Sequence, residues 1–311
     1  MKNLPRSAAN TPKTERPRPL ALAITAGGAR GAYQIGCWKA FHERGVSFEA
    51  VSGSSIGALN AAFICQGDVD LALSFWRELS ETRLLRPDFA RLRVFLLRLS
   101  LDAALFLVPV PNLRAVRIIK YASVGLKLFS RHGSLGTLVR EGLVRLEDLE
   151  PLVGRYLDFR EVLRQPTPLF TTATEVPNEG NGRLGSRWFK LQDLDEDGAR
   201  KILTASVSLP LVSPLIRHNE RSYMDGGIGQ WAPIAPLYEA GFRHIVLLST
   251  KARIRYNHKR YPGCTVSVIH PERSLGRFPR ATFRFSPSAI SRWIDQGYKD
   301  ATLFLDRHRK A

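Results

Sequence analysis

Short apolar runs alternate with longer amphipathic stretches along this chain, in the order strand, helix, strand, helix. Residues 20–25 (LALAIT) form an apolar run that ends at the glycine turn AGGARG, as a buried strand does before a tight connection. Residues 31–45 then show an imperfect helical period that a glycine can end. A strand over residues 47–53 and a helix over residues 54–67 repeat the order. This alternation predicts an α/β fold with right-handed crossovers and a mainly parallel central sheet.

The rest of the chain adds a helical segment and then returns to strands. Further strands are predicted at residues 168–176, 187–191, 221–227, 243–250 and 264–271, and further helices at residues 195–206 and 286–310. We expect a single domain over residues 20–311, with a helical, basic insertion at about residues 68–156. Proline and charge predict a disordered basic tail over residues 1–19.

Positive charge is concentrated in three segments of the chain. The sequence holds 46 Lys and Arg residues against 28 Asp and Glu residues, for a net charge of +18. Residues 1–19 carry five bases and one acid, residues 91–145 ten bases and two acids, and residues 251–284 nine bases and one acid. Such a localised positive field favours an anionic partner, such as lipid headgroups or nucleic acid.

The sequence predicts neither a secretory signal nor a membrane-spanning helix. The run LALAIT is too short for the apolar part of a signal peptide. Residues 91–110 are apolar but contain Arg93, Arg98 and Asp102, and a charge near the middle of a bilayer costs roughly 3 kcal/mol. Three cysteines without metal-ligand spacing predict buried free thiols: Cys37, Cys65 and Cys264. We therefore expect a cytoplasmic protein that is at most peripheral on a membrane.

The segment GSSIG (Gly53–Gly57) fits the pattern G-x-S-x-G, at the junction of the second predicted strand and helix. A sharp turn there needs small residues, and it lifts the serine hydroxyl above the edge of the sheet at a helix N-terminus. The same pattern also occurs as a plain glycine-rich turn with an idle serine. Ser55 is therefore a candidate nucleophile, which requires a base and an oxyanion hole.

Ser55, Asp225 and His244 follow the chain order of an α/β-hydrolase triad. Their position in the chain argues against that fold, because a single strand precedes the strand of the serine turn. His244 also opens a predicted strand, which favours a structural or surface role for it.

The loop AGGARG (Ala26–Gly31) ends the first predicted strand, so it emerges beside the serine turn at the same edge of a parallel sheet. Gly27 and Gly28 lack side chains and can bring backbone N–H groups close to a developing oxyanion. Arg30 adds a positive charge beside that site. Ala26 stands where a dinucleotide-binding loop has its first glycine, which weighs against nucleotide binding.

Together with a distant DGG (Asp225–Gly227), these two motifs resemble the patatin-like phospholipase family, in which a glycine loop, a G-x-S-x-G turn and an aspartate-glycine turn occur in this order. Flanking segments such as GALNAA and LTASVSLPLVSP are also similar. The resemblance covers roughly residues 20–250. It departs at Ala26, where the family has a glycine.

The resemblance implies a three-layer α/β/α patatin-like fold and a Ser–Asp dyad without histidine. Ser55 matches the nucleophile and Asp225 the base, and we expect the oxyanion hole to be formed by the N–H groups of Gly27, Gly28 and Ile56. Supporting roles are expected for Arg30, Gly31, Gly53, Gly57, Gly226 and Gly227.

The expected reaction is the hydrolysis of a carboxylic ester in a lipid, such as a phospholipid or lysophospholipid, through an acyl-serine. No cofactor or metal is expected. Two alternatives remain open: a membrane-surface binding or regulatory protein with the same fold and little turnover, and a Ser–His–Asp esterase.

Other patterns bear on possible partners. Arg117, Lys120, Lys127 and Arg131 fall on one arc of a helix, which fits either a solvated face or a cap that lies on an anionic membrane. Residues 276–285 (GRFPRATFRF) interleave phenylalanines with arginines, but no nucleic-acid-binding motif accompanies them, so we do not expect nucleic acid as a partner.

Residues 193–198 (DLDEDG) imitate the start of a calcium loop. The position that should hold its glutamate is Thr204, so we expect these acids to begin a helix instead.

Overall fold

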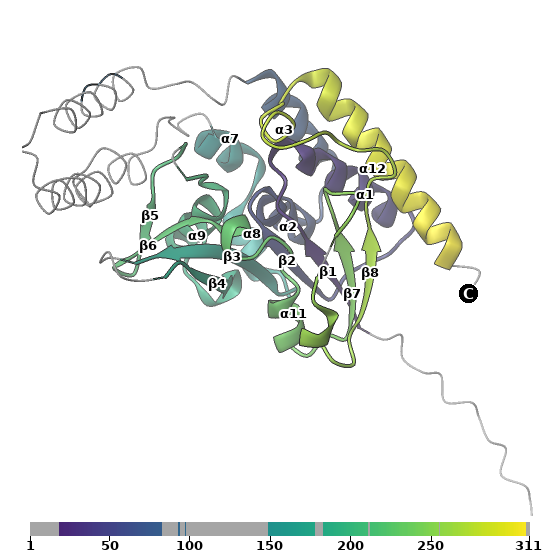
Figure 1. Cartoon of the computed structure of the whole chain (residues 1–311), viewed down its shortest axis with the longest axis horizontal. Coiled ribbons are helices and arrows are strands. Elements are labelled where there is room, and N and C mark those ends of the chain that lie inside the picture. Colours follow the sequence, from purple (N-terminus) through teal and green to yellow (C-terminus); the bar gives the residue numbers. More distant parts are fainter. Residues whose placement is uncertain are drawn as a thin grey trace, which may run out of the picture.

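A single central sheet organises the molecule. The structure is a computed structural model, and it describes residues 19–82, 93, 97, 149–177, 183–210, 212–254 and 256–308. Its strands are β1 (Leu20–Ile24), β2 (Ala50–Ser54), β3 (Leu169–Val176), β4 (Gly185–Lys190), β5 (Ile216–His218), β6 (Arg221–Asp225), β7 (His244–Leu248) and β8 (Thr265–Ile269). They lie in the order β5-β6-β3-β2-β1-β7-β8, and β4 also pairs with β3 (Figure 1).

The sheet is parallel through its centre and antiparallel at one side. Strands β3, β2, β1, β7 and β8 run parallel to one another, whereas β4 and β6 pair antiparallel with β3, and β5 pairs antiparallel with β6. The predicted α/β fold with a mainly parallel sheet is confirmed. The sequence did not predict β5, because a strand of three residues is too short to show a period.

Helices follow most of the strands. They are α1 (Ala32–Glu43), α2 (Ile56–Gln66), α3 (Val69–Glu81), α7 (Leu149–Tyr156), α8 (Phe159–Arg164), α9 (Glu196–Val207), α10 (Gly226–Gly229), α11 (Ala235–Glu239) and α12 (Pro287–His308), with 3-10 turns η1 (Gly28–Gly31), η2 (Leu191–Asp193) and η3 (His258–Arg260). The side chains of Asp68, Asp158 and Asp195 accept backbone N–H groups at the starts of α3, α8 and α9. Asp195 thus caps a helix, as expected for the acidic run around it.

The two faces of the sheet bury different sets of side chains. Along β1, Leu22 and Ile24 point to a face covered by α1, α2, α3, α9 and α12, whereas Ala21 and Ala23 point to the other face. Leu237 of α11 and the half-buried Tyr261 cover that second face. The three layers are therefore a thick helical layer, the sheet and a thin layer, and Figure 1 shows α11 well apart from the main group of helices.

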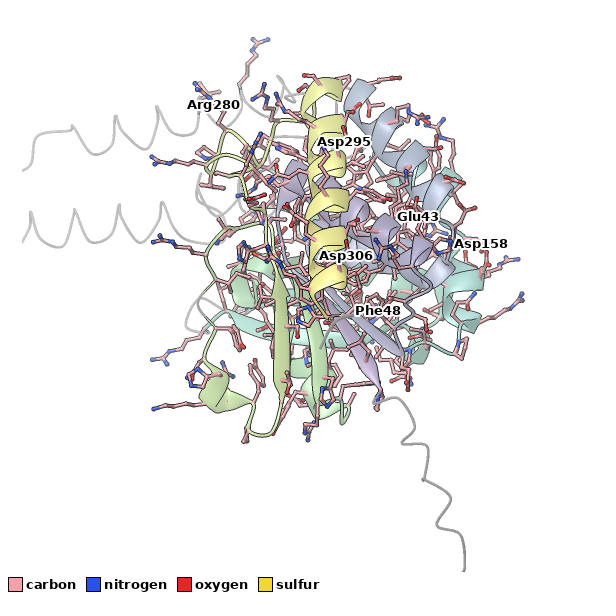
Figure 2. The ribbon with its side chains drawn as sticks, turned by 90° about the vertical axis from the view of Figure 1, so that its right-hand side faces the viewer. Glu43, Phe48, Asp158, Arg280, Asp295 and Asp306 are labelled. Carbon is pink, nitrogen blue, oxygen red and sulfur yellow. The ribbon has the colours of Figure 1, made fainter. Side chains whose placement is uncertain are left out.

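Helix α12 lies lengthwise over the thick layer, as Figure 2 shows, and packs directly on α1. A Cβ atom at Gly36 of α1 would collide with the carbonyl of Ile294, and one at Gly297 of α12 would collide with the carbonyl of Tyr33. Glycine at both positions therefore allows the two helix backbones to touch.

Parts of two predictions fall outside the described residues. The first is the basic tail, of which only Pro19 is described. The second is the middle of the insertion, residues 83–148, of which only residues 93 and 97 are described. The stripe from Arg117 to Arg131 lies in this second range. The described ends of the insertion, α3 and α7, are helical as expected. Phe75 and Trp76 of α3 are completely buried, so this end of the insertion belongs to the body of the domain.

Two of the three cysteines fit their prediction. Cys37 and Cys65 are buried free thiols, whereas Cys264 is partly exposed because it lies in the thin layer; the prediction was wrong for Cys264. Within the described ranges, no helix has the length and apolar character needed to cross a bilayer.

Replacing Gly297 by alanine should lower the free energy of unfolding by about 2–3 kcal/mol, because the new methyl group meets backbone that cannot move aside. Gly154 of α7 is the matched control, since only the end of the Arg200 side chain lies near its Cβ direction. Gly154→Ala should raise stability by about 0.5–1 kcal/mol through helix propensity alone. Urea unfolding of both variants tests this, and equal stabilities would contradict the close contact.

Candidate active site

Ser55 occupies a strained turn between β2 and α2. Its backbone has φ 55° and ψ −131°, a conformation that costs a residue with a side chain about 1–3 kcal/mol. Glycines make the turn possible: a Cβ atom at Gly53 would collide with Ala58, and one at Gly57 would lie 2.5 Å from the carbonyl oxygen of Ile24. The turn lifts the Ser55 hydroxyl out of the sheet at the start of a helix.

Asp225 reaches Ser55 from the other side of β3. Ser54 pairs with Thr172 of β3, and Asp225, the last residue of β6, pairs with the next residue, Ala173. Strand β3 therefore lies between β2 and β6 and brings Ser55 and Asp225 to the same level. The Ser55 hydroxyl donates a hydrogen bond of 2.5 Å to Oδ2 of Asp225. Both residues are buried.

The turn after Asp225 fixes its carboxylate. The Gly227 N–H donates to Oδ1 at 2.7 Å, which leaves Oδ2 for Ser55. A Cβ atom at Gly226 would collide with the carbonyl of Thr172, so the turn packs directly on β3. The two glycines of the DGG motif therefore hold the carboxylate close to the sheet.

Burial raises the pKa of Asp225 to about 6, and the hydrogen bonds from Ser55 and Gly227 oppose that rise. A carboxylate with this pKa is ionised at neutral pH and still has a higher proton affinity than an exposed aspartate. Both properties suit a group that must take a proton from a serine and later return it.

The C-terminal end of α9 contacts both Ser55 and Asp225. Ser206 Oγ accepts the Ser55 N–H at 3.0 Å, and the Ser208 carbonyl accepts the Asp225 N–H at 2.8 Å. Sequence reasoning did not identify Ser206 or Ser208 as site residues. The segment LTASVSLPLVSP, which resembled the family, was the signal that could have indicated them.

Two residues expected to donate backbone N–H groups to an oxyanion line the same cavity as Ser55. The residues Gly28, Ser55 and Ile56 line one cavity, and the Ile56 N–H is free of an intrahelical partner because Ile56 begins α2. The carbonyl of Gly27 accepts Nε of Arg30 at 3.2 Å. Since carbonyl and N–H of a trans peptide point in opposite directions, the Gly28 N–H points away from Arg30.

Gly27 packs against Thr250. A Cβ atom at Gly27 would lie 2.6 Å from Cγ2 of Thr250, and Gly27 is not among the described residues that line the cavity. Of the three expected oxyanion donors, Gly28 and Ile56 line this cavity. Gly31 packs against Ile56, since a Cβ atom at Gly31 would lie 2.8 Å from Cγ2 of Ile56.

Arg30 holds the glycine loop from within the protein. Only 7% of Arg30 is exposed, and besides Gly27 its guanidinium donates to Oγ1 of Thr282 at 3.1 Å. It pairs with no carboxylate within the described residues, and burial lowers its pKa. Thr282 is another residue that sequence reasoning missed, because it comes from a loop more than 250 residues away.

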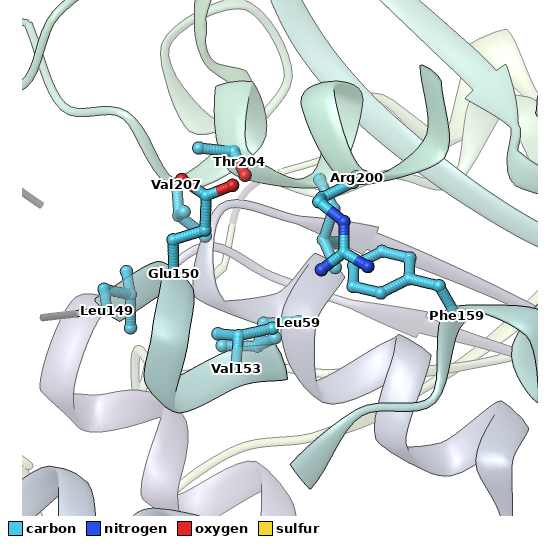
Figure 3. A pocket seen from close by; sticks show the side chains of 9 residues that line it. Leu59, Leu149, Glu150, Val153, Phe159, Arg200, Thr204 and Val207 are labelled. Carbon is cyan, nitrogen blue, oxygen red and sulfur yellow. The ribbon is translucent and has the colours of Figure 1, made fainter. Parts of the chain in front are cut away.

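The cavity beside Ser55 is mostly apolar. Its volume is about 630 Å³ including the open mouth, and its lining includes Leu79 of α3 and Leu149 of α7. Both described ends of the predicted insertion thus border the candidate site. A second cavity of about 440 Å³ adjoins the first, because Leu149 and Val207 line both. Figure 3 shows this second cavity, where the Arg200 guanidinium lies over the Phe159 ring.

The triad considered for a Ser–His–Asp esterase is not brought together. His244 is the first residue of β7 and pairs with Leu20, the first residue of β1, whereas Ser55 lies beyond the last residues of the parallel strands. His244 is therefore at the opposite edge of the sheet. Among the described residues, no three His, Cys, Asp or Glu side chains gather into a group that could hold a metal ion.

Comparison with known families agrees with the three motifs. A sequence model described as patatin-like phospholipase matches residues 22–238, which include Ser55 and Asp225. The chain belongs to the patatin-like phospholipase family. Membership supports lipid hydrolase activity for this patatin-like chain and a lipid as its substrate. No curated protein matches the chain significantly.

Several solved structures are similar to this patatin-like protein, and VipD shares its fold. VipD from Legionella pneumophila has a TM-score of 0.50 at 15% identity, with 94% of this chain and 67% of VipD covered. The type III effector ExoU of Pseudomonas aeruginosa has a TM-score of 0.43 at 20% identity, covering 94% of this chain and 53% of ExoU. Human GIVD cytosolic phospholipase A2 has a TM-score of 0.45 at 12% identity, covering 93% and 59%. This chain spans only part of the length of each.

Replacing Asp225 by asparagine should stabilise the protein at neutral and alkaline pH. The pKa of Asp225 is about 6 in the folded state and about 4 in the unfolded chain. Above pH 6 the Asp225 carboxylate is therefore charged in both states, but it is buried in the folded state and hydrated in the unfolded chain, which destabilises the folded state. Asp225→Asn removes this charge and should raise the free energy of unfolding by about 2 kcal/mol at pH 8. This gain in the free energy of unfolding should fade as the pH falls from 6 to 4, because below about pH 4 the wild-type Asp225 is protonated in both the folded and the unfolded state.

Chemical unfolding at several pH values measures this difference. Asp195→Asn is the control, since asparagine caps a helix as well as aspartate does. An Asp225→Asn variant that is less stable than the wild type from pH 5 to 8 would show that the carboxylate stabilises the fold.

Proposed function

We propose that this patatin-like protein hydrolyses a carboxylic ester bond of a lipid, with Ser55 as the nucleophile and Asp225 as the general base. The observation that carries the proposal is the 2.5 Å hydrogen bond from the Ser55 hydroxyl to a buried carboxylate beside an apolar cavity. The raised pKa of Asp225 supports its role as a base.

In the first half of the reaction, Ser55 Oγ attacks the ester carbonyl carbon and its proton passes to Oδ2 of Asp225. The carbonyl oxygen becomes an oxyanion, which the N–H groups of Gly28 and Ile56 stabilise. The intermediate then collapses, and the alcohol leaves with the proton from Asp225. The product that stays is an acyl-serine ester at Ser55.

In the second half, a water molecule takes the place of the alcohol. Asp225 accepts a proton from the water, whose oxygen attacks the acyl carbonyl carbon. Collapse of this intermediate breaks the bond to Ser55 Oγ, which regains the proton from Asp225, and the fatty acid is released. The pair of residues is then restored to its starting state.

The lining of the cavity supports a fatty acyl ester as the substrate. Apolar side chains from α3, α7 and the segment after α9 line it, including Leu79, Leu149 and Leu209. An acyl chain buries apolar surface there, which is favourable at about 25 cal/mol per Å². The apolar lining and the net positive charge of the protein together favour a phospholipid or lysophospholipid at an anionic membrane surface as the substrate.

Hydrolysis of a short-chain, water-soluble ester tests the chemistry without a membrane. Ser55→Ala should lower kcat/KM by about 10⁴-fold or more, and Asp225→Asn by about 10²–10⁴-fold. The wild-type kcat/KM should rise with pH through an apparent pKa of about 6, because Asp225 accepts the proton only when ionised.

His244→Ala is the control and should change kcat/KM by less than about twofold, because His244 lies at the far edge of the sheet. Full activity of Ser55→Ala, or loss of activity in His244→Ala, would contradict the proposed pair.

A further inference from the structure

The loop between β8 and α12, residues 270–286, lies at the same edge of the sheet as Ser55. Strand β8 runs parallel to β7, and β7 to β1 and β2, so the ends of all four strands meet at one edge. We call residues 273–285 of this connection the rim loop. Its sequence, RSLGRFPRATFRF, contains four arginines and no acid.

The inner side of the rim loop forms part of the candidate site. Thr282, Phe283 and Phe285 line the cavity beside Ser55. The carbonyl of Thr282 also accepts the N–H of Ala29 at 2.9 Å, so the rim loop is bonded to the glycine loop. Leu275 and Ala281 are buried and anchor the rim loop to the domain.

The outer side of the rim loop carries one exposed aromatic residue and several exposed arginines. Phe278 is 73% exposed, more than any other large hydrophobic residue that the structure describes. Arg277, Arg280 and Arg284 of the same loop are also exposed, and within the described ranges none of them pairs with a carboxylate. Figure 2 shows Arg280 at the edge of the molecule.

We propose that the rim loop is the surface by which this protein docks on an anionic membrane. Phe278 enters the acyl region, and the guanidinium groups of Arg277, Arg280 and Arg284 bind lipid phosphates. These arginines lie on both sides of Phe278 in the sequence and have no carboxylate partner among the described residues, so the charge of the rim loop complements that of lipid phosphates. Since Thr282 and Phe283 line the cavity, docking brings the cavity mouth to the lipid. This inference rests on the proposed function for its purpose, but membrane binding is measured without turnover.

Nucleic acid is the other anionic partner that this charge could attract. Binding of single strands uses several aromatic rings on which bases stack. Of the three phenylalanines in the rim loop, Phe283 and Phe285 line the cavity and only Phe278 is strongly exposed. One exposed ring fits insertion into a bilayer better than a stacking platform.

The test measures binding to vesicles, using the full chain with Ser55→Ala so that no lipid is consumed. Phosphatidylcholine vesicles with about one third phosphatidylglycerol are compared with phosphatidylcholine alone, by co-sedimentation. The protein should bind the anionic vesicles. Phe278→Ser should weaken this binding about tenfold, and the double change Arg277→Gln/Arg280→Gln about twentyfold.

Matched controls come from exposed residues elsewhere. Lys259→Gln/Arg260→Gln removes the same charge at the opposite edge of the sheet, in the connection just before β8 begins, and Leu303→Ser removes an exposed apolar side chain of α12. Both should change vesicle binding by less than about twofold.

Three results would overturn the proposal: no binding of the anionic vesicles, an equal loss in the Lys259/Arg260 control, or binding to single-stranded RNA without binding to vesicles. Failure of the proposed function would be seen separately, as absent hydrolysis of the water-soluble ester by a protein that still binds vesicles.

Discussion

The hydrogen bond between Ser55 and Asp225 depends on the unequal lengths of neighbouring strands. Strand β3 has eight residues and continues beyond the end of β2, and β6 pairs antiparallel with this extension. Because β6 runs antiparallel to β3, its last residue, Asp225, arrives one position beyond Ser54, at the level of Ser55. The proposed nucleophile after a parallel strand and the proposed base at the end of an antiparallel strand therefore meet at the end of β3, although 170 residues separate them in the chain.

This arrangement stores unfavourable energy that the rest of the fold has to offset. Ser55 has a strained backbone, and Asp225 holds a charge with little access to water. Hydrogen bonds to Ser206, Ser208 and Gly227 hold both residues in place. Activation of a serine by a single carboxylate is favoured when that carboxylate has a raised proton affinity, so the destabilising burial of Asp225 also supports the proposed chemistry.

Local motifs made the nucleophile turn and the glycine loop predictable, because strand, glycine turn and helix follow one another within a few residues at both. The DGG turn was identified through its resemblance to a family, and the antiparallel pairing of β6 with β3 that brings it to Ser55 carries no local signal. The buried position of Arg30 and its bond to Thr282 were also beyond sequence reasoning, since both depend on a distant loop. The packing of Gly27 against Thr250 likewise depends on a residue more than 200 positions away in the chain.

Covalent labelling of the nucleophile tests the central claim most directly. A fluorophosphonate reacts with a serine only when a neighbouring base activates it, and intact-mass measurement detects the adduct. The account predicts one adduct on the wild type and none on Ser55→Ala, with labelling of Asp225→Asn slower by at least about 10²-fold. Equal labelling of the wild type and Asp225→Asn, or an adduct that persists in Ser55→Ala, would contradict it.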